Sequence, residues 1–341
     1  MEFEGEPGPY LAAVVQAAPC GFDNQATLDK VAKWTAKAKK VKARLVVFPE
    51  AFVGAYPFGN DFGTRIGLRT PEGRKNYAEY YRAAIKIPGP EVSALAEVAK
   101  ENSCYLVIGV VERAGSTLYS STIFFSPEGN LLGSRRKLMN SGVERYVWGQ
   151  GDGTSLHVFP TSLGLLGAVI GGESYMPPLR MTLYSKGMNL YCAPTVDDSD
   201  VWASSMRTVA LEGRCFVLSA CQLLRRSDLP AGYTISDQVP DGEFLIRGGS
   251  CIVDPLGTVL AEPIFNRECL ITATIDMTVV ARAKYDFDVV GHYARSDIFR
   301  LEVNENRQIA VSKALITMKP MKPMKPMKAA MRRERDDSRT V

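Results

Sequence analysis

The chain has 341 residues, of which 46% are hydrophobic and 23% are charged, as in an ordinary globular protein with a sizeable core. No apolar run approaches the roughly 18 residues that a membrane-spanning helix needs, and the acidic first six residues do not resemble a secretory signal. The net charge of +4 does not indicate nucleic-acid binding, because residues 317–341 carry eight basic and three acidic side chains. We therefore expect neither a membrane nor a nucleic acid as a partner.

Seven cysteines are scattered singly through apolar segments, without C-x-x-C pairs. Such a pattern predicts reduced, buried thiols and hence a cytoplasmic protein. No cluster of histidine, cysteine and carboxylate residues has the spacing of a metal site, so we expect no metal and no cofactor. The two histidines, His157 and His292, are expected to pack against neighbouring side chains.

Strand and helix patterns alternate along the chain. Tyr10–Ala17 predicts a buried strand, and Asn24–Lys40 an amphipathic helix with Asn24 as its N-cap. The later predicted elements are strand 45–48, helix 90–102, strand 104–111, a hairpin of 118–125 and 131–138, strand 165–170, strand 188–192, helix 202–212, strand 215–220, a hairpin of 250–253 and 258–261, strand 270–275 and a helix from 277. This order predicts an α/β protein with layered sheets and helices outside them.

The composition does not change before residue 310, which predicts a single domain over residues 1–310. A Met-Lys-Pro repeat follows at Met318–Lys328, within a charged tail. A proline at every third position fixes φ and removes hydrogen-bond donors, so residues 311–341 are predicted to be extended or disordered. The tail is either a tether for an acidic partner or a solvated extension without one.

Three charged residues follow predicted strands. Glu50 comes after an apolar strand and Pro49, where it is either a desolvated general base or a solvated loop residue. Lys137 lies at the end of the first hairpin and Glu144 beyond it. Either Lys137 supplies a positive charge near developing negative charge and Glu144 a further carboxylate, or both belong to a solvated loop. The glycine-rich stretch Val147–Gly153 does not match a phosphate-binding pattern and is expected to be a turn-forming loop beneath the site.

A sharp turn is expected directly after strand 165–170, before a helix that opens near Met176. Strand-to-helix elbows of this kind display a reactive side chain at the top of an α/β sheet. Here the turn reads Gly171-Gly172-Glu173-Ser174, and the glycines supply no reactive group.

Taken together, these segments closely resemble the nitrilase family over roughly residues 8–305. The family reads Cys-Trp-Glu-Asn at the elbow and Pro-Thr where this chain has Asn140-Ser141. The resemblance implies a four-layer α-β-β-α sandwich, with Glu50 as the general base and Lys137 as the electrostatic stabiliser. It further implies that Glu144 is the second glutamate and that Gly171 occupies the position of the nucleophilic cysteine.

In the family mechanism a thiolate adds to the nitrile carbon, and water then releases ammonia and an acid or amide. Without the sulfur, the chain is predicted to be inactive. Cys192 and Ser174 are the candidate substitutes, although Cys192 matches a cysteine that related nitrilases have at that position.

The resemblance also implies a small nitrile or carboxylate ligand and a homo-oligomer, alone or mixed with active relatives. Two alternatives to a simple inactive homologue stay open. One is an active nitrilase whose Cys-Trp was changed to Gly171-Gly172 by engineering or a sequence error; the other is a non-catalytic subunit of nitrilase oligomers.

Overall fold

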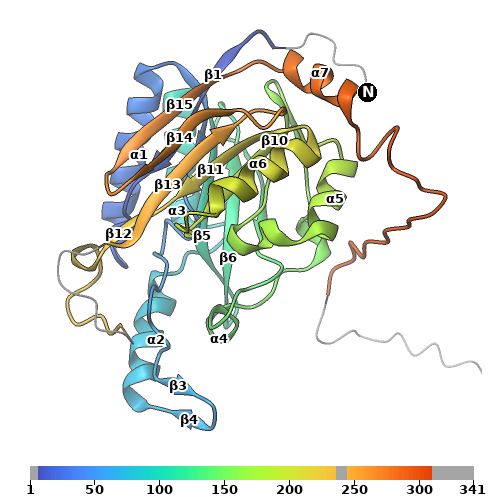
Figure 1. Cartoon of the computed structure of the whole chain (residues 1–341). Coiled ribbons are helices and arrows are strands. Elements are labelled where there is room, and N and C mark those ends of the chain that lie inside the picture. Colours follow the sequence, from blue (N-terminus) through green and yellow to red (C-terminus); the bar gives the residue numbers. More distant parts are fainter. Residues whose placement is uncertain (1–6, 236–243, 309–341) are drawn as a thin grey trace, which may run out of the picture. The chain divides into compact units, whose positions relative to one another are not determined.

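Two β-sheets lie at the centre of the computed structural model, which describes residues 7–235 and 244–308 (Figure 1). The first sheet has the order β15-β1-β2-β5-β6-β7. Its strands are β1 Tyr10–Gln16, β2 Ala43–Val47, β5 Tyr105–Ala114, β6 Thr117–Phe125, β7 Leu131–Arg136 and β15 Cys269–Ile275. Strands β1, β2 and β5 are parallel, so their carboxyl ends lie at one edge of the sheet.

The second sheet has the order β12-β13-β11-β10-β9-β8, with β14 paired to β13. Its strands are β8 Phe159–Thr161, β9 Gly164–Ala168, β10 Leu190–Thr195, β11 Phe216–Cys221, β12 Leu223–Arg225, β13 Phe244–Val253 and β14 Val259–Phe265. Strands β9, β10 and β11 are also parallel to one another. A separate small hairpin joins β3 Thr64–Arg65 to β4 Leu68–Arg69.

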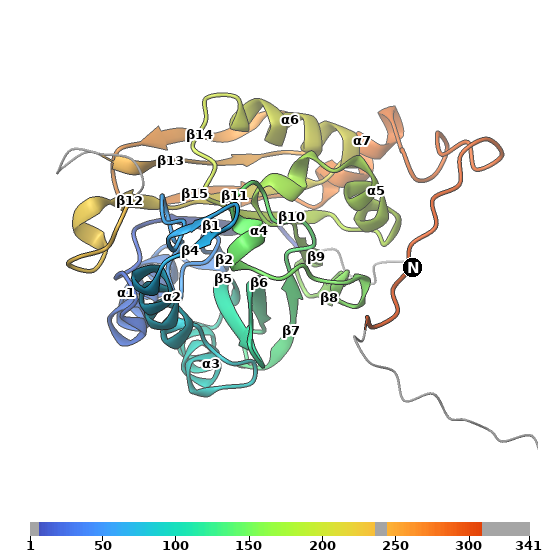
Figure 2. The ribbon, with the colours of Figure 1, turned by 90° about the horizontal axis from the view of Figure 1, so that it is seen from below.

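Helices cover the outer face of each sheet (Figure 2). The helices of the described residues are α1 Asn24–Lys40, α2 Pro71–Ala83, α3 Pro90–Asn102, α4 Glu144–Val147, α5 Pro177–Ser185, α6 Trp202–Gly213 and α7 Thr278–Asp286, with short 3-10 turns η1 Gly153–Ser155, η2 Gly171–Tyr175 and η3 Arg226–Asp228. Helices α1 and α3 pack on the first sheet, and α5 and α6 pack on the second. The predicted four-layer α-β-β-α sandwich is confirmed.

Alternation along the strands produces the layers. On β1 and β2, Val14 and Val47 face the second sheet, whereas Val15 and Val46 face the helices α1 and α3. Side chains point to opposite faces at successive strand positions, so a continuous apolar run can be buried on both faces. The strands that carry the site are therefore held between two cores.

The N-cap of α1 and the presence of α2 differ from the sequence-based elements. Asp23, not Asn24, is the N-cap of α1, since its Oδ1 accepts a hydrogen bond from the Ala26 N–H at 3.0 Å. Helix α2 was not predicted, because only Gly73, Tyr80 and Ala83 of it are buried and its apolar periodicity is weak.

The chain through Arg307 forms one unit. The predicted boundary at residue 310, the tail 311–341 and the acidic first six residues lie outside the described residues, so those predictions stand as predictions. Within the described ranges, no helix combines the length and apolarity needed to cross a membrane.

Candidate active site

The turn after β9 bends sharply at Gly171. The backbone of Gly171 has φ of 52°, in the left-handed region that glycine adopts without a steric penalty. The 3-10 turn η2 begins there and leads into α5. The expected strand-to-helix elbow is thus present, although a 3-10 turn precedes the helix.

Glu50 follows the carboxyl end of β2 and is completely buried. Its neighbourhood is tight, because a Cβ atom on Gly109 would stand 2.6 Å from the Glu50 Cα. The Glu50 backbone carbonyl accepts a hydrogen bond from the side-chain amide of Gln222, which comes from the loop between β11 and β12. Of the two alternatives for Glu50, the structure therefore supports the desolvated carboxylate.

Lys137 joins two carboxylates. Its Nζ donates to Glu50 Oε1 at 2.8 Å and to Glu144 Oε2 at 2.9 Å. The Ser120 hydroxyl donates to Glu50 Oε1 at 3.1 Å, and the Tyr56 hydroxyl donates to Glu144 Oε1 at 2.8 Å. Glu50 and Lys137 are buried and Glu144 is partly buried. The three form one cluster, in which a single ammonium group lies between two carboxyl groups.

Burial and charge act against each other on these groups. Burial, partly offset by the Lys137 ammonium and reinforced by Glu144, raises the pKa of Glu50 to about 7. For Lys137, burial lowers the pKa, but the Glu50 and Glu144 carboxylates outweigh it and raise the pKa above its usual value. Lys137 therefore stays charged at neutral pH, while Glu50 exchanges a proton near pH 7, as suits a general base.

The free oxygen of Glu50 faces Gly171. A Cβ atom on Gly171 would stand 2.6 Å from Glu50 Oε2 and 3.4 Å from Lys137 Nζ. Glu50 Oε2 is buried and has no hydrogen-bond partner among the described residues. The structure therefore brings Gly171 together with the cluster of Glu50, Lys137 and Glu144.

The loop that carries Glu144 is held by Asn140. The buried Asn140 side-chain amide donates to the carbonyls of Trp148 at 2.8 Å and Gly149 at 3.0 Å. The Gly151 N–H donates to the Lys137 carbonyl at 2.7 Å, so the glycine-rich loop packs behind the lysine as expected.

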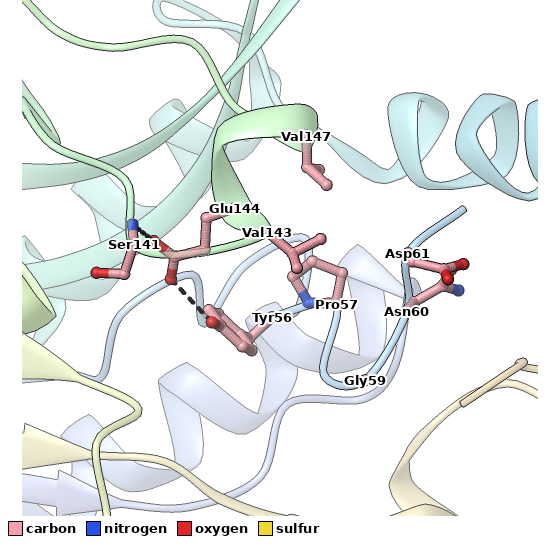
Figure 3. Close-up of a pocket in the computed structure, with 9 residues that line it drawn as sticks. All are labelled: Tyr56, Pro57, Gly59, Asn60, Asp61, Ser141, Val143, Glu144 and Val147. Atoms are coloured by element: carbon pink, nitrogen blue, oxygen red, sulfur yellow. Dashed lines mark hydrogen bonds between the residues drawn. The ribbon is translucent and has the colours of Figure 1, made fainter. Parts of the chain in front are cut away.

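A pocket of about 260 Å³ ends on Glu144 (Figure 3). Part of the lining is apolar and part is polar. All the lining residues come from two segments, 56–61 and 141–147. The lining residues are Tyr56, Pro57, Gly59, Asn60, Asp61, Ser141, Val143, Glu144 and Val147. A cavity of this size and mixed lining suits a small organic molecule.

Neither Cys192 nor Ser174, the candidate substitutes for the missing thiol, is a reactive group beside Glu50 and Lys137. Cys192 lies in the core between the sheets, and burial raises the pKa of its thiol. The buried Ser174 hydroxyl accepts a hydrogen bond from the Tyr191 hydroxyl at 3.1 Å. Neither is the activated nucleophile that covalent catalysis requires.

The other polar residues singled out from the sequence lie elsewhere. The expected packing role is wrong for His292, which is exposed after α7, and His157 is also exposed, with its ring 5.9 Å from that of Phe159. Cys20 and Cys269 are only partly buried, unlike the other cysteines. In residues 7–235 and 244–308, no group of three or more histidine, cysteine and acidic residues could hold a metal ion.

A four-layer sandwich with a Glu-Lys-Glu cluster beside a strand-to-helix elbow is the arrangement that the resemblance to the nitrilase family implies. Residues 11–285 match the family model "Carbon-nitrogen hydrolase", and the chain belongs to this family.

Within the family, the chain is similar to nitrilases. It is 52% identical to an aliphatic nitrilase of Sinorhizobium fredii, over 89% of this chain and 98% of the relative. It is 49% identical to a bifunctional nitrilase/nitrile hydratase of Nicotiana tabacum, over 88% of each chain. A solved carbon-nitrogen hydrolase from Helicobacter pylori shares the fold, with a TM-score of 0.68 and 21% identity over 85% of this chain and 97% of that chain.

Proposed function

We propose that this protein is a nitrilase homologue that binds a small nitrile or carboxylate beside Glu50, Lys137 and Glu144 but does not hydrolyse it. Support for the ligand comes from the identity with nitrilases of about one residue in two and from the pocket that ends on Glu144. Support for the lack of hydrolysis comes from Gly171, which offers no nucleophile.

One observation carries this proposal. Glu50 Oε2 is buried, unpaired and 2.6 Å from the place where a side chain would begin on residue 171. Because residue 171 is glycine, Glu50 has no thiol proton to accept. In serine proteases, removing the nucleophile costs about a millionfold in kcat, or about 8 kcal/mol in barrier, which the remaining groups do not supply.

Ammonia release from a panel of aliphatic and aromatic nitriles tests the proposal. The original chain should release none above background, whereas the paired change Gly171→Cys and Gly172→Trp should restore turnover. Adding Glu50→Gln to the restored protein should abolish that turnover again. Turnover by the original chain at rates typical of enzymes would refute the proposed inactivity.

Ligand binding is measured separately by calorimetry on the original chain, with a nitrile and the carboxylic acid of the same carbon skeleton. Heat of binding from either compound, reduced by Val143→Trp in the pocket, would support a binding function. No heat and no thermal shift across the panel would leave only a structural role.

A further inference from the structure

Glu173 lies at the centre of a buried hydrogen-bond network beneath the site. Its side chain is fully buried on η2, two residues after Gly171. Its Oε2 accepts hydrogen bonds from Arg135 Nη1 at 2.7 Å and from the Ile170 N–H at 3.1 Å. Its Oε1 accepts from the backbone N–H groups of Leu138 and, at 3.3 Å, Met139.

These donors belong to the two segments that make the site. Leu138 and Met139 directly follow Lys137, whereas Ile170 directly precedes Gly171. One carboxylate is thus hydrogen-bonded to both the lysine loop and the elbow. The length of a single side chain therefore sets the separation of the two segments.

Stability alone is a weak reason for such an arrangement. Arg135 is 1% exposed and Glu173 is not exposed at all, so both charges have lost their hydration. Buried ion pairs of this kind often contribute little to stability compared with apolar groups of similar volume. What the pair does provide is a fixed geometry between two loops.

We propose that Glu173 is a positioning residue, which fixes Lys137 and Glu50 against position 171 by joining the lysine loop to the elbow. The role does not depend on nitrile hydrolysis, because it concerns the placement of groups around residue 171. Both carboxylate oxygens of Glu173 accept hydrogen bonds, so an amide cannot replace it. In either orientation the amide NH₂ of a glutamine would face N–H donors of one segment and release it.

A thiol introduced at position 171 reports on this geometry. In the full-length chain carrying Gly171→Cys, the rate of alkylation by iodoacetamide is measured from pH 5 to about pH 10, with mass spectrometry of the peptide that contains residue 171. Adding Glu173→Gln should lower the alkylation rate at pH 7 by about tenfold or more. The midpoint of the pH profile should move by about one pH unit, toward the ordinary thiol value of about 8.5.

Glu112→Gln is the matched control. Glu112 is also buried, and its carboxylate binds Arg136 on the same strand as Arg135, together with the Ser121 hydroxyl. It joins strands of the first sheet, and its carboxylate forms no hydrogen bond or ion pair with the elbow residues 171–175. Its replacement should leave the alkylation profile of the introduced thiol unchanged.

A second variant, Glu173→Asp, retains the charge but shortens the side chain, and should also lower the alkylation rate. An unchanged profile in folded Glu173→Gln or Glu173→Asp protein would overturn the proposal. Failure of both variants to fold would overturn it as well, since Glu173 would then be required by the fold rather than by the site.

Turnover provides a further readout in the protein restored with Gly171→Cys and Gly172→Trp. Glu173 does not line the pocket, so Glu173→Gln should lower kcat by at least about tenfold and change KM little. If the restored protein releases no ammonia, the proposed function is in doubt, and the alkylation profile still decides the role of Glu173.

Discussion

Glu50 Oε2 lies 2.6 Å from the point where a Cβ atom would stand on Gly171. The two residues are far apart in sequence and come from different sheets, at the ends of β2 and β9. A side chain at residue 171 would meet this oxygen at once. The close approach of Glu50 to residue 171 should therefore affect the stability of variants at both positions.

The two elbow glycines should respond in opposite directions to alanine. Gly171→Ala should lower the free energy of unfolding by about 1–2 kcal/mol, because its φ of 52° is unfavourable for a residue with a Cβ atom. Moving Glu50 Oε2 adds to this cost. Gly172→Ala should be neutral or stabilising by about 0.4–1 kcal/mol, because alanine restricts the unfolded chain. Its Cβ would stand 2.8 Å from Ser141 Oγ, and the exposed Ser141 side chain can move aside.

Gly115→Ala is the control for these measurements by urea denaturation. Gly115 has φ of 60° and nothing within 4 Å of its Cβ position, so its replacement measures the backbone cost alone. If Gly171→Ala costs no more than Gly115→Ala, then Glu50 does not occupy the space in front of residue 171.

Glu50→Gln should flatten the dependence of stability on pH. The pKa of Glu50 is raised from 4.5 to about 7, so the folded protein keeps a proton that the unfolded chain has released between these values. The stabilisation from this proton is complete below about pH 4.5 and is lost as the pH rises through about 7. Urea denaturation between about pH 5 and pH 8 should show a smaller decline for the variant; an identical decline would contradict the raised pKa.

Lys137→Met should destabilise the protein strongly at neutral pH. It removes the cation between the buried carboxyl group of Glu50 and the partly buried one of Glu144, and breaking a buried ion pair costs about 3–5 kcal/mol. The loss should be smaller at pH 5, where Glu50 is protonated and needs no counter-charge. Lys100→Met breaks an exposed pair with Glu97 and should change stability by less than about 0.5 kcal/mol at both pH values.

Asn140→Ala should loosen the loop that carries Glu144. The change removes two buried hydrogen bonds to the carbonyls of Trp148 and Gly149, which should cost about 1–3 kcal/mol. Amide hydrogen exchange over residues 140–149 should rise while the sheets stay protected. Asn130→Ala, at an exposed hairpin turn, should change neither quantity.

Regular apolar patterns made most of the fold predictable from the sequence. Helices α1 and α3 begin and end at the predicted residues, because their apolar positions recur with helical spacing between clear end signals. The N-cap of α1 was misplaced by one residue, since Asp23 and Asn24 are both good capping residues and only the backbone distinguishes them. The hairpin of β3 and β4 consists of very short, mostly exposed strands, which leave no apolar pattern to detect.

The site was predictable only in part. The family resemblance singled out Glu50, Lys137 and Glu144, and the structure places them in contact. Their partners Ser120, Tyr56 and Gln222 were missed, because each comes from a distant segment and has no local pattern of its own. Gln222, for example, stands 172 residues beyond Glu50.

The burial of five of the seven thiols has a consequence for redox chemistry. Oxidants react with exposed cysteines whose pKa is low enough for the thiolate to form. An enzyme with a catalytic cysteine is therefore vulnerable to peroxide at its active site. Here residue 171 has no sulfur, and burial raises the pKa of Cys104, Cys192 and Cys251. The Glu50–Lys137–Glu144 cluster should therefore keep its geometry under peroxide concentrations that inactivate a thiol-dependent enzyme.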